Sequence, residues 1–301
     1  MTSNPASRLG QAIENGDFIV TAEITPRLSG SADDVLQQAL PLKGKVTAVN
    51  VTDGAGARVA MSSIAASAIL ARNGIEPVLQ MTCRDRNRIA IAADLVGASA
   101  LGVQNVLVLT GDKPGAGDEP DAKGVFDFTA NEIISLARKM SVEGKINSGR
   151  EIMNPPQFVL GGVDAPFDPP ADWQPEKLAA RRDVGMQFIQ TQFCYEPEAT
   201  RRYVERLADY GLLDNVALII GIGPLASLRS AKWMDENLYG VSIPEPVIQR
   251  LEETDDEAAE GHRICVELIE QYKNMPGVAG VHIMAPAQGA QRIADVVDAA
   301  F

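Results

Sequence analysis

Two carboxylates in this sequence, Glu23 and Asp112, lie in or directly after predicted strands, at positions where their side chains can reach a ligand site. Glu23 lies in the alternating segment 21–25, on the same strand face as two threonines. Asp112 ends the segment 105–112, an apolar run that stops in turn residues and is typical of a strand buried on both faces. Burial favours the protonated form of a carboxyl group, so one carboxyl can act as a general acid while the other stays ionised. A salt bridge for Glu23 and a turn cap for Asp112 are the structural alternatives.

Eight strand-like segments, each followed by a helical pattern, must position these side chains. The predicted strands cover 18–25, 48–52, 77–82, 105–112, 157–163, 188–195, 217–222 and 278–284. The predicted helices cover 7–16, 31–42, 62–72, 87–98, 129–140, 175–185, 198–210, 227–236, 245–274 and 289–301. In a chain of 301 residues this alternation predicts an α/β fold, a (β/α)8 TIM barrel that forms a single domain over residues 1–301. The helix over 7–16 leads into the barrel, 245–274 is an extra helical insertion before the last strand, and a doubly wound sheet is the alternative fold.

In a barrel the carboxyl ends of all the strands meet at one mouth, where ligands bind. Besides the two carboxylates, the strand ends supply hydroxyl, amide and glycine positions: Thr52 with Asp53, Gln80 with Thr82, Gly161 with Gly162, Gln192, and Gly221 with Gly223. The amide of Gln192 offers both a donor and an acceptor, and a satisfied core amide is its structural alternative. This ring contains no metal-binding cluster and suits an organic ligand held by hydrogen bonds.

The composition limits the classes of partner and compartment. A hydrophobic content of 46% with 22% charged residues is typical of a soluble globular protein, and no run of about 18 apolar residues predicts a membrane span. Residues 1–16 lack the apolar centre of a secretion signal, so we expect a cytoplasmic protein. The formal charge of −13 argues against nucleic acid as a partner. Three cysteines without a CxxC spacing and two histidines predict no metal site, and we expect His282, inside a predicted strand, to be buried and hydrogen-bonded.

The segment 221–226 matches the pattern GxGxxA between a predicted strand and a predicted helix, which is formally a dinucleotide-binding fingerprint. It comes late in the chain, and Pro224 removes a backbone N–H that could face a phosphate. We therefore interpret it as a barrel turn.

Six segments, taken in order, resemble the methylenetetrahydrofolate reductase family. They are the first strand with Glu23 and its end at Pro26-Arg27, Val51-Thr-Asp-Gly-Ala55, Met81-Thr-Cys-Arg-Asp-Arg-Asn-Arg88, Asn105 to Asp112 with Pro114, Thr191-Gln-Phe193, and Gly221-Ile-Gly-Pro224. Together they extend over about residues 18–290. Each segment is weak evidence alone, whereas the ordered set is specific.

The resemblance implies a flavin-binding (β/α)8 barrel that reduces 5,10-methylenetetrahydrofolate to 5-methyltetrahydrofolate, or that runs in reverse in one-carbon catabolism. It implies FAD, with FMN as the alternative flavin, and NADH or NADPH as the co-substrate. The implied partners are the folate substrate and the nicotinamide nucleotide, without nucleic acid or membrane. A homo-oligomer is compatible with this interpretation.

The resemblance also implies roles for single residues. Glu23 is implied as the general acid that helps to open the five-membered ring of the substrate, and Asp112 as a catalytic residue beside the flavin and the folate. Gln192, Asp112 and Met234 are implied as substrate contacts. The implied flavin contacts are Thr52, Gln80, Thr110, Gly111, Asp112, Phe128, Thr129, Gly161, Gly162, Val163, Lys177 and Arg181.

Three positions depart from the common pattern of the family. Gln80 stands where many members have histidine, Thr110 where many have arginine, and Met234 where an aromatic residue often stacks on the substrate. The segments 110–112 and 280–284 are closer to the branch of one-carbon catabolism and acetogenesis than to the enteric type. Two other hypotheses stay open. One is a flavin-less folate-binding or scaffolding subunit of a methyl-transfer complex, and the other is a barrel aldolase or isomerase, for which the strand ends offer neither a Schiff-base lysine nor a metal cluster.

Overall fold

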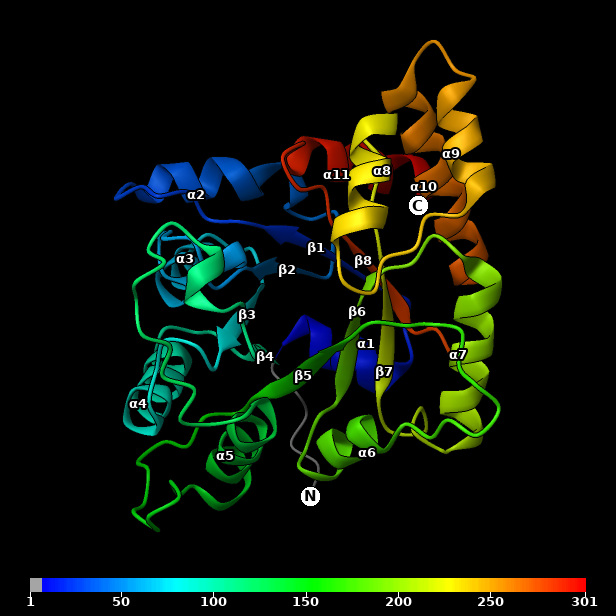
Figure 1. Ribbon diagram of the computed structural model, residues 1–301. Helices are drawn as coiled ribbons and strands as arrows, with labels where there is room; N and C mark the ends of the chain where they lie inside the picture. The colour runs from blue at the N-terminus through cyan, green and yellow to red at the C-terminus, as the bar shows by residue number, and fades with distance from the viewer. Residues whose placement is uncertain (1–6) are drawn as a thin grey trace.

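The computed structural model describes residues 7–301, and its eight strands form a closed parallel barrel in which consecutive strands are neighbours (Figure 1). The strands are β1 (Ile19–Ile24), β2 (Ala48–Val51), β3 (Pro77–Thr82), β4 (Asn105–Leu109), β5 (Val159–Asp164), β6 (Phe188–Phe193), β7 (Ala217–Ile222) and β8 (Gly280–Ile283). Each begins within two residues of its predicted start, because a short apolar run between turn residues is buried most readily as a parallel strand. The predicted (β/α)8 barrel is confirmed.

Helices surround the barrel on its outside, except α1, which packs against the amino-terminal end of the barrel interior (Figure 1). They are α1 (Arg8–Asn15), α2 (Ala32–Ala39), α3 (Ser63–Arg72), α4 (Arg88–Ala100), α5 (Ala130–Glu143), α6 (Glu176–Asp183), α7 (Pro197–Asp209), α8 (Leu228–Asn237), α9 (Glu245–Glu252), α10 (Glu257–Lys273) and α11 (Ala290–Ala300). The predicted insertion over 245–274 is present as two helices, since the side chain of Asp256 accepts from Ala259 N and starts α10 anew. No helix within residues 7–301 is both long enough and apolar enough to cross a membrane.

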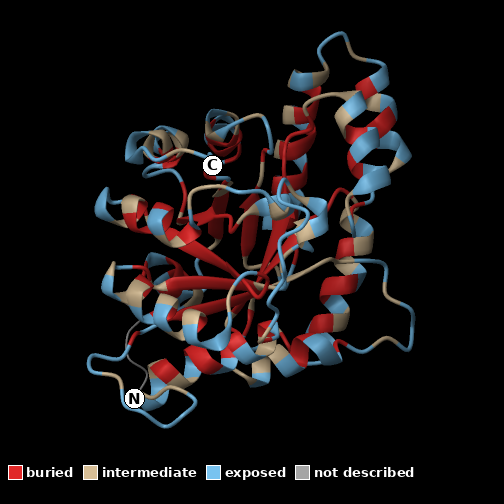
Figure 2. Ribbon diagram, turned by 60° about the vertical axis from the view of Figure 1, so that its left-hand side comes forward, coloured by how far each residue is buried: buried red, intermediate tan, exposed pale blue. Residues whose placement is uncertain are grey.

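The barrel interior changes from apolar at its amino-terminal end to polar at its mouth. An apolar layer joins inward side chains of the strands with Leu9 and Ala12 of α1; its strand members are Ile19, Ala48, Val78, Leu107, Val159, Phe188 and Ile219. The strands form the buried red centre of Figure 2, and most exposed residues lie on the outer helices and loops. Because strand side chains alternate, the next inward position of each strand lies one layer closer to the mouth. Thr21, Asn50, Gln190 and His282 occupy that second layer and are buried.

Candidate active site

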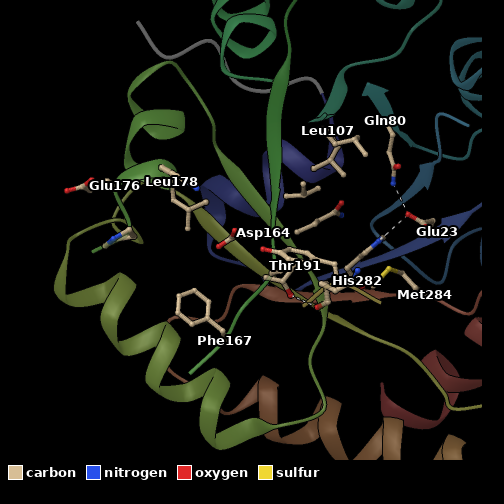
Figure 3. Close-up of a pocket in the computed structure, with 18 of the residues that line it drawn as sticks. Glu23, Gln80, Leu107, Asp164, Phe167, Glu176, Leu178, Thr191, His282 and Met284 are labelled. Atoms are coloured by element: carbon tan, nitrogen blue, oxygen red, sulfur yellow. Dashed lines mark hydrogen bonds and ion pairs between the residues drawn. The ribbon is translucent and has the colours of Figure 1, made fainter. Parts of the chain in front are cut away.

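A cavity of about 640 Å³ opens at the carboxyl ends of the strands (Figure 3). Its lining combines carboxylate, amide and imidazole groups of β1, β3, β6 and β8 with apolar side chains of β4 and β5 and with the segment 164–178. This size and mixture are typical of a site for a small organic ligand. Within residues 7–301, no group of three or more His, Cys, Asp or Glu side chains is arranged to hold a metal ion.

Glu23 is the carboxylate around which the hydrogen bonds of this cavity are arranged. Gln80 Nε2 donates to Glu23 Oε2 over 2.7 Å, and His282 Nε2 lies 3.7 Å from the same oxygen (Figure 3). The side chain of Glu23 keeps 23% of its surface accessible, so a bound molecule can reach the carboxylate. The arrangement can therefore present a proton donor or acceptor to a ligand in the cavity.

Beneath Glu23, four buried polar side chains form a hydrogen-bonded chain across the barrel, which we term the polar layer (Thr21, Asn50, Gln190 and His282). Thr21 Oγ1 lies 2.9 Å from His282 Nδ1 and accepts from Gln190 Nε2 over 3.0 Å. Asn50 and Gln190 exchange their amide hydrogen bonds, at 2.6 and 3.1 Å. These bonds replace the water that the buried groups have lost. The expectation of a buried and hydrogen-bonded His282 is confirmed.

The cavity brings together some of the residues that the resemblance implies, namely Glu23, Gln80, Val163, Lys177 and Gln192. Gln192 Oε1 accepts from Phe193 N over 3.0 Å, at the point where the register between β6 and β7 shifts. Its Nε2 has no acceptor in the described part of the chain and is available to a ligand. Lys177 is exposed and brings a cation from α6 to the cavity.

Asp112 is not among the residues that line the cavity. Its side chain is exposed, and its Oδ2 accepts from Gly56 N over 3.0 Å. Gly117 packs against the same loop so closely that a Cβ there would lie 1.8 Å from the carbonyl oxygen of Ala57. We term residues 52–62 and 110–129 the interlocked loops. In this structure Asp112 therefore joins two loops, a contact that is neither the expected ligand contact nor a cap of its own turn.

The interlocked loops carry further residues that the resemblance implies as flavin contacts, and none of them lines the cavity: Thr52, Thr110, Gly111, Phe128 and Thr129. Thr52 is buried, and its Oγ1 has no hydrogen-bond partner among the described residues. Phe128 packs in the outer apolar cluster, with the Arg88 guanidinium 4.8 Å from its ring centroid. Thr129 caps α5, because its hydroxyl accepts from Glu132 N. Phe128 and Thr129 thus help to hold α5 and the loop before it in place.

Four more implied residues also lie away from the cavity lining. Gly161 faces the barrel interior, where a Cβ would lie 2.2 Å from the Phe188 ring, so the glycine makes room for that ring. Gly162 packs near Arg181, whose Nη1 donates to the Val163 carbonyl over 2.6 Å. Met234 is buried in α8. All four help to pack the barrel wall and its helices.

Three aromatic side chains that sequence reasoning did not single out also line the cavity: Phe167, Trp173 and Tyr239. The rings of Phe167 and Trp173 meet edge to face with their centroids 5.2 Å apart, and Tyr239 is 90% exposed. Exposed rings around a cavity can stack on a flat heteroaromatic ligand. The only signal in the sequence is their position in segments that follow β5 and α8.

Asp53, at the end of β2, is a buried anion that links β2 to β3. Arg86 donates to its two carboxylate oxygens over 2.7 and 3.1 Å, and the Ser63 hydroxyl and Thr82 N each donate over 2.9 Å. Burial by itself would raise the pKa of Asp53, but these hydrogen bonds and the Arg86 charge outweigh it and lower the pKa. Asp53 is therefore ionised and structural at neutral pH.

The sequence matches the family model for methylenetetrahydrofolate reductase over residues 8–298. That range takes in every strand of the barrel. The match therefore rests on the whole fold and not on one motif.

Curated relatives carry the same description at modest identity. The chain is 27% identical over 298 residues to methylenetetrahydrofolate reductase 2 of Schizosaccharomyces pombe, covering 90% of this chain and 43% of that protein. It is 26% identical over 236 residues to the probable methylenetetrahydrofolate reductase (NADPH) of Caenorhabditis elegans, covering 75% and 32%. It is 23% identical over 268 residues to the 5,10-methylenetetrahydrofolate reductase of Salmonella typhimurium, covering 85% and 81%. The chain thus spans less than half the length of these two eukaryotic relatives.

Solved structures share the architecture. An uncharacterized protein from Clostridium thermocellum, described as binding two copies of 5-methyl-5,6,7,8-tetrahydrofolic acid, aligns with a TM-score of 0.63 at 17% identity and covers 98% of both chains. DmoA from Hyphomicrobium sulfonivorans aligns with a TM-score of 0.53 at 10% identity, covering 93% of this chain and 86% of its own. At these identities the likeness establishes the barrel fold alone.

Proposed function

Because this chain belongs to the methylenetetrahydrofolate reductase family, we propose that it reduces 5,10-methylenetetrahydrofolate to 5-methyltetrahydrofolate, with NADH or NADPH as the source of the hydride. The observation that carries the proposal is the position of Glu23. It is an accessible carboxylate, held by Gln80, in a cavity of about 640 Å³ at the barrel mouth. A proton donor beside the reacting atoms and room for a flat ring are what this reaction requires.

The reduction consumes one proton and one hydride. Protonated Glu23 gives its proton to N10 of the folate, the bond between N10 and the methylene carbon breaks, and an iminium remains between that carbon and N5. The hydride adds to the same carbon and completes the methyl group, and the nicotinamide leaves oxidised. Gln192 donates from its free Nε2 to the folate ring and orients it, and Phe167 and Tyr239 stack on its flat parts.

The lining residues also fit a flavin ring. Leu109 and Val163 supply an apolar wall, Gln80 supplies an amide beside it, and Lys177 supplies a cation for a phosphate group. When bound, a flavin carries the hydride from the nicotinamide to the folate. We propose FAD in this role, with Gln80, Val163 and Lys177 among its contacts.

The purified protein tests the proposal. We expect continued turnover of NADH or NADPH, beyond one equivalent per bound flavin, only when methylenetetrahydrofolate is added, 5-methyltetrahydrofolate to appear in equal amount, and a flavin spectrum in the visible range. If neither nicotinamide gives turnover in either direction, the proposal is wrong.

A second candidate function is folate binding without a flavin, as in a subunit of a methyl-transfer complex. The interlocked loops support this function. They contain many of the implied flavin contacts, yet these residues do not line the cavity, and the bond from Gly56 N to Asp112 joins the loops to each other. This function predicts a colourless protein that binds 5-methyltetrahydrofolate in calorimetry and does not oxidise NADH or NADPH.

A further inference from the structure

Asp164 is a carboxylate of the cavity that has no part in the proposed reduction so far. It is the last residue of β5 and is half-buried in the cavity lining. In the closed ring of eight strands β5 lies opposite β1, so Asp164 and Glu23 stand on facing walls of the cavity (Figure 3). A ligand that spans the cavity can therefore contact one carboxylate at each of its ends.

One oxygen of Asp164 is held by a buried tyrosine of α7. The Tyr203 hydroxyl donates to Asp164 Oδ2, and the Tyr203 side chain is fully buried, with its ring against those of Phe167 and Trp173. Burial, followed by the nearby charge of Asp164, raises the pKa of Tyr203, so the hydroxyl keeps its proton and remains a donor. This bond fixes the direction of the carboxylate without neutralising its charge.

The other oxygen of Asp164 is available to a ligand. Among residues 7–301, Asp164 has neither a second hydrogen-bond donor nor an ion-pair partner. Thr191, its strand partner on β6, donates instead to the Gln192 carbonyl and accepts from Gly221 N. A charged acceptor that is oriented and unpaired in a cavity favours a ligand that brings N–H donors to it.

Of the ring systems in the proposed reaction, the pterin of the folate offers two adjacent N–H donors. Its 2-amino group and its N3–H point the same way, as two N–H groups of a guanidinium do, and they match the two oxygens of one carboxylate. The nicotinamide carboxamide presents a single donor nitrogen, and the N3–H of a flavin lies between two carbonyl oxygens that a carboxylate repels. The reacting atoms N5 and N10 lie toward the other end of the folate ring system, which is the end that Glu23 must reach.

We propose that Asp164, held by Tyr203, is the specificity-determining residue for the 2-amino and N3–H edge of the folate, an inference that rests on the proposed function. The two Asp164 oxygens accept from these two nitrogens, and Oδ2 has a lone pair left for this beside its bond from Tyr203. Gln192 Nε2, on the neighbouring strand β6, donates to the 4-carbonyl of the same ring. The pterin thereby enters in one orientation, with N10 toward Glu23.

Two ligands and two proteins isolate this contact. Calorimetry gives the Kd of 5-methyltetrahydrofolate and of its 2-desamino analogue for the wild type and for Asp164→Asn. The wild type should bind the analogue roughly 100-fold more weakly than 5-methyltetrahydrofolate, because one carboxylate oxygen is left unpaired. Asp164→Asn should lose affinity for 5-methyltetrahydrofolate by a similar factor and should no longer distinguish the two ligands. A wild type that does not distinguish them, or a variant that distinguishes them as well as the wild type does, overturns the proposal.

Tyr203→Phe tests the part played by the tyrosine, because it removes the hydroxyl and keeps the buried ring. Its affinity for 5-methyltetrahydrofolate should fall roughly tenfold, and its preference over the 2-desamino analogue should shrink. Asp168→Asn is the matched control, since it weakens a second side-chain contact between the segment after β5 and α7, that of Asp168 with Arg202. Asp168 does not line the cavity, so this variant should bind both ligands as the wild type does. Wild-type affinities in Tyr203→Phe would overturn the positioning role of the tyrosine.

These affinities do not depend on turnover, so the two failures are distinguishable. If the wild type reduces methylenetetrahydrofolate while Asp164→Asn binds both ligands as the wild type does, the inference is wrong and the proposed function stands. If Asp164→Asn loses the discrimination in a protein that oxidises neither NADH nor NADPH, the inference is supported and the proposed function is refuted. A wild type that binds no folate refutes both.

Discussion

Gln80 on β3 and Glu23 on β1 are joined by a 2.7 Å hydrogen bond across the barrel interior, although β2 separates the two strands in the sheet. His282 faces the same carboxylate oxygen from β8. Groups from two other strands thus lie against the Glu23 carboxylate before any ligand binds. Such preorganisation lowers the cost of placing a proton donor beside a reacting atom.

Replacing Glu23 by glutamine should lower kcat for methylenetetrahydrofolate reduction by about 100-fold or more, because the amide keeps the shape of the side chain and cannot give up a proton. Binding of 5-methyltetrahydrofolate in calorimetry should change little, and flavin reduction by NADH or NADPH in stopped-flow should persist. Glu176→Gln, at the same cavity, is the control and should keep its turnover. Full turnover in Glu23→Gln would remove Glu23 from the acid role.

Replacing Gln80 by methionine should lower kcat roughly tenfold, because it removes one hydrogen bond to a carboxylate while keeping the side-chain volume. KM for the folate should change less than kcat, since the altered contact is to Glu23. Steady-state kinetics at several folate concentrations separates the two parameters. A rise in KM at constant kcat would instead make Gln80 a direct ligand contact.

Replacing Asp112 by alanine should loosen the interlocked loops by about 1 kcal/mol, because Gly56 N loses its acceptor. Asp112→Asn keeps an acceptor oxygen and should hold the loops nearly as well. Hydrogen exchange at Gly56 measures the difference between the two variants. If Asp112→Asn keeps that protection and yet loses folate turnover, the carboxylate has the catalytic role that the resemblance implies.

Replacing Gly117 by alanine should separate the interlocked loops, because its Cβ would lie 1.8 Å from the Ala57 carbonyl oxygen and backbone cannot move aside as a flexible side chain does. The barrel itself should stay folded. Limited proteolysis should cut within 52–62 or 110–129 faster than in the wild type. Gly115→Ala is the matched control, since a Cβ at that position meets no atom within 4 Å.

Replacing Asp53 by asparagine should destabilise the protein by about 2 kcal/mol at neutral pH, because Arg86 loses its buried anion and keeps only its ion pair with the less buried Asp94. The pKa of Asp53 in the folded state is lowered from its ordinary value of 3.8, so its contribution is fully present above that value and is lost as the pH falls through the folded pKa. Urea unfolding should therefore give a difference between variant and wild type that narrows at acid pH.

The exposed pair of Asp168 and Arg202 supplies the control for the Asp53 experiment. Asp168→Asn should change the free energy of unfolding little at any pH, because solvent screens the charges of both Asp168 and Arg202. A gap between Asp53→Asn and wild type that stays constant down to the acid transition would contradict the pH dependence.

Much of the site could be predicted from the alternation of side chains along each strand, because this alternation is a local property of the sequence. The two-residue period predicts that Glu23 and Gln192 face inward, and both line the cavity. The same period places His282 inside the barrel, where it is buried and hydrogen-bonded. These inferences need only the strand and its direction.

The loops could not be predicted in this way. Asp112 stands directly after a strand, yet its orientation depends on Gly56, which is 56 residues away, and on how closely Gly117 approaches the chain there. The aromatic lining from Phe167 and Tyr239 likewise depends on how two segments fold back over the mouth. The periodicity of a sequence gives no information on how distant loops pack against each other. A resemblance to a family identifies the position of a residue in the chain but not the direction of its side chain.

Glu23 belongs to the first strand and His282 to the last, so the two meet only where β1 and β8 join. At that seam Gly280 lies so near Ile19 that a Cβ would be 2.1 Å from the Ile19 carbonyl oxygen. The Glu23 carboxylate and the His282 imidazole are therefore brought together only when this seam closes. A nascent chain that still lacks β8 contains the carboxylate without its neighbouring ring.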